Sequence, residues 1–371
     1  MKKVVIVGGG LAGLISAICI RKAGIDVLLV EKKSYPFHRV CGEYVSNEVR
    51  DFLERLEIFP VKLQPPSIDQ LLLTSLEGKR CGIPLPLGGF GISRYHFDHF
   101  LFEKASALGV EFLLQTQVSN VLVRNEEFTV KIEGGEEILA EVVIGAFGKR
   151  SRLDKTLDRN FLKKRSPYLG VKYHIRYNDH PENTIALHNF KNGYCGVNKV
   201  EDGIYNLCYL SARSNLAGMK DIREMEEKVL SKNPALKNIF STAELMFDKP
   251  LVINEISFET KGPVENHILM CGDAAGMIAP FSGNGMAMAI HSAYLLSKEV
   301  IEYFTDHRSR LILEQNYTTQ WNAVFRSRLW TGRMIQRLFG SETVSNLAVD
   351  VVRNSKWVAS FLEKQTHGKP F

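Results

Sequence analysis

The N-terminal segment from Lys2 to Glu31 constrains the fold of this chain more than any other part of the sequence. Its first β-branched run, Lys3 to Val7, has the composition of a strand buried on both faces. A helical segment and a second apolar strand follow, and between the first strand and the helix stand the glycines Gly8, Gly10 and Gly13. This order predicts a dinucleotide-binding βαβ unit. The alternative is a glycine-rich turn that opens an ordinary βαβ unit.

Each residue of this motif has a physical task in the predicted site. Gly8 permits a tight turn, Gly10 lets the backbone approach a pyrophosphate, and Gly13 lets the helix pack closely on the strand. Glu31 follows Gly13 by 18 residues (31 − 13), near the spacing of about 20 expected for a carboxylate that binds ribose hydroxyls. An acid at this point favours FAD or NAD over NADP.

The composition limits the class of protein. A chain of 371 residues can form two domains, and its net charge of +6 is too small to indicate nucleic-acid binding. Its six scattered cysteines have no metal-ligand spacing, so we expect no metal site and a reducing, cytoplasmic location. The glycines interrupt the apolar run after Lys2 and Lys3, which argues against a secretory signal. No apolar run is long enough to predict a membrane-spanning helix.

The pattern of strands and helices predicts an α/β fold whose two domains alternate along the chain. Buried parallel-type strands and helices predict a nucleotide-binding domain over three stretches, residues 1–66, 93–165 and 263–305. Short alternating segments predict an antiparallel substrate domain over two stretches, residues 67–92 and 166–262. Within it, Gly193 to Gly196 is interpreted as a hairpin tip or sheet edge, and Tyr194 as a packed aromatic rather than a catalytic group. A helical region is predicted over residues 306–371.

The loop after Glu31 is a second candidate for cofactor contact. Arg39 is a plausible contact for a phosphate or ribityl group, and the backbone of Cys41, Gly42 and Glu43 could approach a flat ring. The alternative is that Cys41 is a small buried hydrophobe and Glu43 a solvated carboxylate.

A third candidate site lies at the end of the predicted strand from His267 to Cys271. Asp273 follows this strand and could bind a sugar-like hydroxyl. The glycines Gly283 and Gly285 then open a helix whose N-terminus offers N–H groups and a positive dipole to negative charge. A strand-to-helix turn capped by Asp273 is the alternative, but it does not explain the second glycine cluster.

The C-terminal helix carries an aromatic stripe spaced by four residues, namely Tyr317, Trp321, Phe325 and Leu329. Such a stripe first of all predicts a helix packed on its own domain, with solvated arginines around it. Peripheral membrane contact is the alternative.

Three motifs stand in one order along the chain: the N-terminal fingerprint with Glu31, AEVVIGAFGKRS from Ala140, and CGDAAGMIAPFSGNG from Cys271. With these three motifs in this order, the chain resembles the FAD-dependent family typified by para-hydroxybenzoate hydroxylase. The loop from Cys41 to Glu43 and the compact length are most similar to the geranylgeranyl reductase branch. The resemblance implies a Rossmann-type FAD-binding domain, an inserted antiparallel-sheet substrate domain and C-terminal helices.

The resemblance also implies roles for individual residues. Asp273 binds the ribityl chain, the helix start at Gly283 to Gly285 faces the flavin pyrimidine edge, and the loop from Cys41 to Glu43 lies by the isoalloxazine. The predicted catalytic residues are Cys41 and Glu43. The predicted cofactor-binding residues are Gly8, Gly10, Leu11, Ala12, Gly13, Glu31, Lys32, Arg39, Cys41, Gly42, Arg94, Val118, Gly148, Gly272, Asp273, Pro280, Gly283, Asn284, Gly285 and Met286.

The sequence departs from the family pattern at two places. Phe147 replaces the aspartate of the hydroxylases' Asp-Gly pair, which leaves the electron donor open between NAD(P)H and a separate redox partner protein. The tryptophans Trp321, Trp330 and Trp357 do not form the W-x-W-x-I-P motif of the flavin halogenases, which argues against halogenation.

Three functions are compatible with these motifs. The predicted function is a monooxygenase that hydroxylates an aromatic or lipophilic small molecule through a flavin hydroperoxide, because hydroxylation dominates the wider family, and the other two functions are alternatives. The closer branch favours a reductase of carbon–carbon double bonds in an isoprenoid. The third is a non-catalytic FAD-fold protein, such as the Rab escort proteins that hold prenyl chains, and the intact Glu31 and third motif argue against it.

Overall fold

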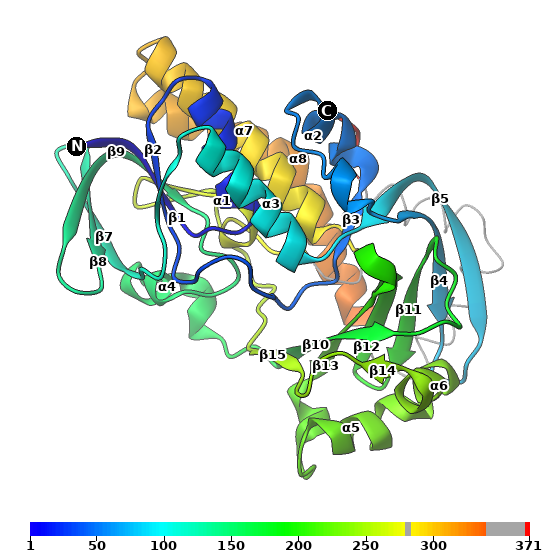
Figure 1. Cartoon of the computed structure of the whole chain (residues 1–371). Coiled ribbons are helices and arrows are strands. Elements are labelled where there is room, and N and C mark those ends of the chain that lie inside the picture. The colour runs from blue at the N-terminus through cyan, green and yellow to red at the C-terminus, as the bar shows by residue number, and fades with distance from the viewer. Residues whose placement is uncertain (279–282, 339–367) are drawn as a thin grey trace.

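The computed structural model describes residues 1–278, 283–338 and 368–371, which form two β-sheets and a group of long helices (Figure 1). The first sheet has the strand order β16-β17-β9-β1-β2-β6, with the hairpin of β7 and β8 beside β9. Its central pairs are all parallel. The apolar runs that the sequence predicts to be buried strands form β1, β2 and the end of β9. The bounds are β1 Lys2–Val7, β2 Val27–Val30, β6 Glu111–Leu113, β7 Val118–Arg124, β8 Glu127–Ile132, β9 Glu137–Gly145, β16 Val264–Glu265 and β17 Ile268–Met270.

Four long helices pack beside the first sheet. Figure 1 shows α1 (Leu11–Lys22), α3 (Arg94–Ala107), α7 (Gly285–Thr305) and α8 (Arg310–Leu338) side by side. The Ser93 hydroxyl accepts a hydrogen bond from the His96 N–H and caps α3. The apolar faces of these helices and the sheet form one continuous core. Shorter helices are α2 (Arg50–Arg55) and α4 (Arg152–Thr156).

The second sheet lies beyond the ends of these helices and has the order β14-β10-β13-β12-β11-β4-β5-β3, with β15 also on β10 (Figure 1). All its pairs are antiparallel except β11 with β4. The helices α5 (Ile222–Lys228) and α6 (Pro234–Thr242) belong to this part of the molecule. The strands are β3 Tyr44–Ser46, β4 Ser67–Thr74, β5 Arg80–Gly91, β10 Tyr168–Arg176, β11 Thr184–Phe190, β12 Gly193–Lys199, β13 Tyr205–Ala212, β14 Glu244–Leu245 and β15 Leu251–Asn254.

The predicted fold class is confirmed, and three details of the prediction change. The segment Gly193–Gly196 is not a hairpin tip, because it begins β12, which pairs with β11 and β13 on its two sides. The strand β3 belongs to the second sheet, although residues 1–66 were predicted to lie wholly in the nucleotide-binding domain. Helix α6 was not predicted, and its start is capped by Asn233.

The aromatic stripe of α8 is buried, as its core interpretation predicts. Tyr317 donates a hydrogen bond from its hydroxyl to the Met270 carbonyl oxygen at 2.7 Å, and Trp321, Phe325 and Leu329 pack in the main core. The stripe is therefore not available as a membrane-contacting face in this fold. Among the described residues, no helix combines the length and the apolar character that crossing a bilayer requires.

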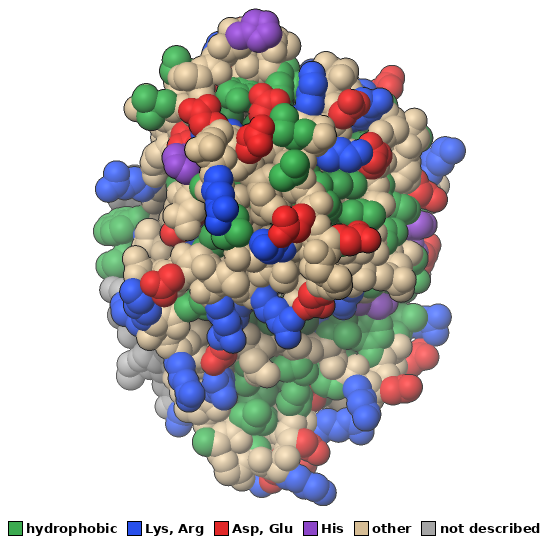
Figure 2. Space-filling view, turned by 90° about the vertical axis from the view of Figure 1, so that its left-hand side faces the viewer, with side chains coloured by type: hydrophobic (Ala, Val, Ile, Leu, Met, Phe, Trp, Pro, Cys, Tyr) green, Lys and Arg blue, Asp and Glu red, His purple; other side chains and the backbone are tan. Residues whose placement is uncertain are grey.

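Basic residues concentrate in the segment from Lys149 to Arg165, but many of them are paired. Arg150 pairs with Glu255, Arg152 with Glu133, and Lys164 with Glu259. Figure 2 shows the face that forms the left side of Figure 1, where Lys and Arg side chains are interspersed with Asp and Glu. These ion pairs neutralise part of the positive charge of this segment.

Candidate active site

One large cavity of about 880 Å³ opens between the two sheets. Its volume is in the upper part of the range of about 300–1,000 Å³ for ligand pockets. Both predicted catalytic residues line this cavity, and so do most of the predicted cofactor-binding residues, namely Gly8, Gly10, Leu11, Ala12, Glu31, Lys32, Arg39, Cys41, Gly42, Arg94, Val118, Gly148, Gly272, Asp273, Gly283, Gly285 and Met286. Gly13 and Asn284 do not line it, and Pro280 lies outside the described residues.

The turn between β1 and α1 has the shape that a pyrophosphate requires. Gly8 has a φ of +108°, and a Cβ there would come within 2.5 Å of the Ala146 carbonyl oxygen. A Cβ on Gly13 would lie 2.0 Å from the Gly8 carbonyl oxygen, so Gly13 packs the helix on the strand instead of facing the cavity. Gly10 is the N-cap and has no side chain to cap the first N–H groups of α1. These N–H groups fit an anionic ligand.

Glu31 is buried at the end of β2, on the cavity wall. Its carboxylate accepts hydrogen bonds from the Gly9 N–H at 2.8 Å and from the Lys33 N–H at 3.1 Å. The two bonds fix the carboxylate beside the glycine turn. A carboxylate has further lone pairs, so this arrangement fits ribose hydroxyls as additional donors.

Two arginines are held on the cavity wall by one buried carboxylate, Asp98. Its oxygens accept from Arg39 Nε at 3.0 Å and from Arg94 Nε and Nη2 at 2.6 and 2.7 Å. Burial opposes the charge on Arg94, but Asp98 and the Cys41 thiol outweigh burial and raise the pKa of Arg94. The sequence reasoning missed Asp98, although its spacing of four from Arg94 on a helix is a usable signal.

Glu43 anchors the loop that carries Cys41. Its side chain is 0% exposed, so the alternative of a solvated carboxylate is wrong. One carboxylate oxygen accepts from the Arg94 N–H at 2.7 Å and from Lys172 Nζ, and the other lies 2.7 Å from His174 Nε2. Burial alone would raise the pKa of Glu43, but Lys172 and His174 outweigh it and lower the pKa to about 2. The carboxylate is therefore ionised at neutral pH.

The same loop is held through its backbone by side chains from the second sheet. Asn206 donates to the Gly42 carbonyl oxygen at 2.8 Å, and Asn198 donates to the Glu43 carbonyl oxygen at 3.2 Å. The sequence reasoning missed these two asparagines together with Lys172 and His174. The available signal was weak, since it consists only of polar residues inside apolar strands.

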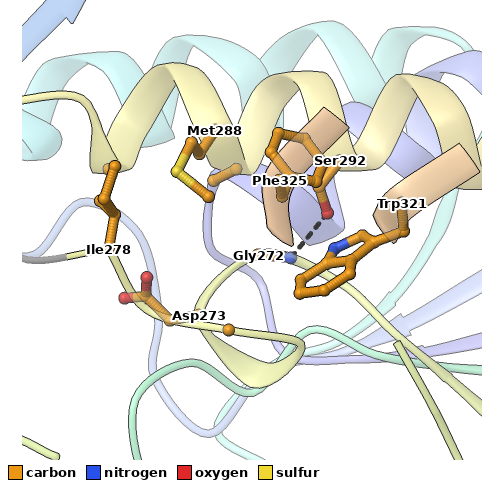
Figure 3. Close-up of a pocket in the computed structure, with 10 residues that line it drawn as sticks. Gly272, Asp273, Ile278, Met288, Ser292, Trp321 and Phe325 are labelled. Carbon is orange, nitrogen blue, oxygen red and sulfur yellow. Dashed lines mark hydrogen bonds between the residues drawn. The ribbon is translucent and has the colours of Figure 1, made fainter. Parts of the chain in front are cut away.

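Asp273 lies in the short turn η7 (Gly272–Ala274), close to the start of α1. A Cβ on Gly272 would come within 2.9 Å of the Ala12 Cβ, and the Gly272 N–H donates to the Ser292 hydroxyl at 2.9 Å (Figure 3). Behind the turn, between α7 and α8, only about 10 Å³ of space remains, which is about the size of one water molecule. Of these two spaces, the large cavity is the one with room for a ligand of nucleotide size.

Lys261 connects the turn η7 to the segment from Ala140 to Ser151, which contains Lys149. Its Nζ donates to the Asp273 carbonyl oxygen at 2.9 Å and to the Lys149 carbonyl oxygen at 2.8 Å. Burial lowers the pKa of Lys261 to about 8.

Another part of the cavity wall is apolar, and most of it comes from the second sheet and its connections. The side chains that form it are Ile185, Leu187, Tyr194, Leu210, Val252, Ile253, Ile256 and Met277. The cavity therefore has a polar end at the glycine turn and an apolar end at the sheet. This division fits a nucleotide cofactor at one end and a lipophilic molecule at the other.

Comparison with known proteins agrees with this geometry. A family model described as "FAD binding domain" matches residues 90–327, more than half of the chain, and a second model of the same description matches residues 3–38. Digeranylgeranylglycerophospholipid reductase 1 of Methanopyrus kandleri is 24% identical over 358 residues, which cover 90% of each chain. The putative FAD-dependent monooxygenase YetM of Bacillus subtilis is 26% identical over 329 residues, covering 84% of this chain and 87% of that protein.

Solved structures share the fold. The geranylgeranyl bacteriochlorophyll reductase-like protein of Thermoplasma acidophilum superimposes with a TM-score of 0.79 at 19% identity, covering 97% of this chain and 95% of that chain. The family match and the cavity lead to one conclusion. The chain belongs to the FAD-binding flavoproteins of the para-hydroxybenzoate hydroxylase type, with relatives among the geranylgeranyl reductases, and it is an FAD-dependent oxidoreductase.

Proposed function

We propose that this protein reduces a carbon–carbon double bond in a lipophilic, isoprenoid-like molecule, with Cys41 as the proton donor. The observation that carries the proposal is the position of the Cys41 thiol. The thiol lines the cavity beside the Arg94 guanidinium, on a loop that Glu43, Asn198 and Asn206 hold in place.

The chemistry requires a hydride and a proton. Bound and reduced, FAD supplies two electrons as a hydride to one carbon of the double bond. The other carbon takes the proton from Cys41 Sγ, and the Arg94 guanidinium stabilises the thiolate that remains. The thiolate regains a proton from solvent, which restores the site.

Glu43, which the sequence suggested as a second catalytic residue, has a positioning role in this proposal. A carboxylate with a pKa of about 2 holds no proton to donate at neutral pH. Its bonds to Lys172 and His174 connect the loop to β10, so it holds the Cys41 thiol at the cavity wall.

The FAD site is proposed at the polar end of the cavity. The first N–H groups of α1, with Arg39, would bind the pyrophosphate, and Glu31 the adenosine ribose. Asp273 would bind the ribityl chain. The apolar wall from the second sheet would hold the substrate and exclude water.

Hydroxylation is the second candidate. The observation that favours it is the start of α7, where Gly283, Gly285 and Met286 line the cavity and the helix dipole could stabilise negative charge on an oxygen species. The relative named as a putative FAD-dependent monooxygenase agrees with this candidate.

The experiment is a single turnover of photoreduced enzyme. Under anaerobic conditions, mixing with geranylgeraniol should return the flavin absorbance to the oxidised spectrum. Cys41→Ser should slow this step by about 10²-fold or more while leaving FAD affinity unchanged. The matched control is Cys208→Ser, because Cys208 also lines the cavity but has no assigned role. Reoxidation only by oxygen, with a hydroxylated product, would favour the second candidate.

A further inference from the structure

Two cysteines from distant parts of the chain line the large cavity on the side of the second sheet. Cys41 lies in the loop after β2, and Cys208 lies in β13. Both side chains are half-buried and belong to no disulfide. Cys271 also lines the cavity, but it follows β17 of the first sheet, and its Sγ lies 3.1 Å from the Ser292 hydroxyl.

The loop that carries Cys41 lies against β13 beside Cys208. Asn206, two residues before Cys208 and on the same face of the strand, donates to the carbonyl oxygen of the next loop residue, Gly42, at 2.8 Å. Lys172 is the partner of Cys208 in the register of β10 and β13, and its Nζ donates to the carboxylate of the same loop. The two contacts hold the loop against the strand on both sides of Cys208.

The surroundings of Cys208 keep its thiol protonated but leave it on the cavity wall. On β12 its register partner is Gly196, which also lines the cavity and has no side chain to cover Cys208. Burial raises the pKa of the Cys208 thiol to about 12, and among the ionisable groups around it Cys41 contributes most. A protonated thiol is a poor nucleophile, so Cys208 is not the sulfur that reacts first with an oxidant.

We propose that Cys208 is the resolving cysteine of Cys41: hydrogen peroxide oxidises the Cys41 sulfur, and Cys208 then closes a disulfide with it. Reduced flavin forms hydrogen peroxide when it meets oxygen, so a thiol beside a flavin is exposed to this oxidant. The purpose of the disulfide rests on the proposed function, because it protects the thiol that donates the proton. Cys208 takes no part in the reduction itself.

The oxidation takes two steps. The Cys41 thiolate, beside the Arg94 guanidinium, attacks one peroxide oxygen. An S–O bond forms, the O–O bond breaks, and the departing hydroxide takes up the proton that the thiol released and becomes water. The Cys208 sulfur then attacks the Cys41 sulfur, so the S–S bond forms, the S–O bond breaks, and the oxygen leaves as water with the Cys208 proton. The two sulfurs lose one electron each, and the peroxide gains both.

The disulfide matters because the next oxidation of Cys41 is irreversible. A sulfenic acid that meets a second peroxide becomes a sulfinic acid, which thiol reductants do not reverse. A disulfide, in contrast, returns to two thiols by exchange with a thiol reductant. Cys208 therefore keeps the oxidation of Cys41 reversible.

The test uses FAD-loaded protein with the flavin oxidised. It is treated with hydrogen peroxide, its remaining thiols are alkylated, and its peptides are analysed by mass spectrometry. In the wild type we expect a peptide pair linked through Cys41 and Cys208, with the loss of two hydrogen atoms, and full recovery of both thiols in dithiothreitol. In Cys208→Ser, Cys41 should reach the sulfinic acid and not recover. The control is Cys19→Ser, because Cys19 is also half-buried but does not line the cavity, and it should behave as the wild type.

This measurement is independent of the reduction of an alkene, since it detects only the masses of peptides. The linked peptide in a protein that reduces no alkene would support the disulfide and reject the proposed function. Wild-type protein whose Cys41 stays unmodified, or becomes a sulfinic acid without a linked peptide, would overturn the proposal, and this arm requires no variant to fold. Recovery of Cys41 in Cys208→Ser as complete as in the wild type would also overturn it.

Discussion

Replacing Glu43 by glutamine should destabilise the protein strongly, although the change removes only a charge. The fold lowers the pKa of Glu43 from 4.5 to about 2. A difference of about 2.5 units corresponds to about 3 kcal/mol in favour of the ionised, paired carboxylate. The variant also leaves Lys172 buried without its counter-charge, and losing one partner of a buried pair costs about 3–5 kcal/mol. We therefore expect a loss of about 3–5 kcal/mol in the free energy of unfolding.

Urea unfolding at pH 7, followed by tryptophan fluorescence and circular dichroism, measures this loss. The control is Glu54→Gln, which removes an exposed carboxylate paired with Arg50 at 2.8 Å and should change little. The pH dependence gives a second check. Because the folded pKa is the lower one, the contribution of Glu43 is complete above pH 4.5 and is lost as the pH falls toward 2. A Glu43→Gln protein as stable as the control would refute this account of the loop.

Three further predictions concern the cofactor, the electron donor and the C-terminal helix. Glu31→Lys should weaken FAD binding, because it removes hydrogen bonds to a charged carboxylate that contribute roughly 1.5–3 kcal/mol each. Flavin fluorescence quenching measures the affinity for FAD, and an unchanged affinity would exclude Glu31 as a ribose ligand. Because Phe147 replaces an aspartate, NADPH alone should reduce the flavin slowly, and rapid stoichiometric reduction in stopped flow would show this to be wrong. Trp321→Ala should cost about 3–5 kcal/mol in stability, since Trp321 is buried in the core; a loss below 1 kcal/mol would contradict its core role.

The sequence was sufficient for the nucleotide-binding half of the fold. Its strands are continuous apolar runs, such as Val4 to Val7 and Val142 to Gly145, which pair in parallel as predicted. The glycines at positions 8, 10 and 13 have geometric roles that follow from the chain itself. Local signals of this kind require no knowledge of distant contacts.

The contacts that hold the Cys41 loop on the second sheet could not be predicted in the same way. His174 and Asn206 are partners in the register of β10 and β13, and Asn206 and Asn198 are partners in the register of β13 and β12. Only this pairing brings the polar side chains to one place on the sheet. Strand β12 was missed for a related reason, because Gly193 suggested a turn. In the fold, a Cβ on Gly193 would lie 2.4 Å from the Leu210 carbonyl oxygen, so the glycine permits close packing within a sheet.

The most direct test of the proposed reaction is the mass of the product. Photoreduced enzyme is mixed anaerobically with geranylgeraniol in deuterated water, and the extracted lipid is analysed by mass spectrometry. Both the flavin N–H and the Cys41 thiol exchange with solvent, so the proposed reduction places one deuterium on each carbon of a former double bond. The Cys41→Ser enzyme should yield far less of this product. Recovery of unlabelled starting lipid under these conditions, with an added oxygen atom appearing only when air is admitted, would contradict the proposed reduction.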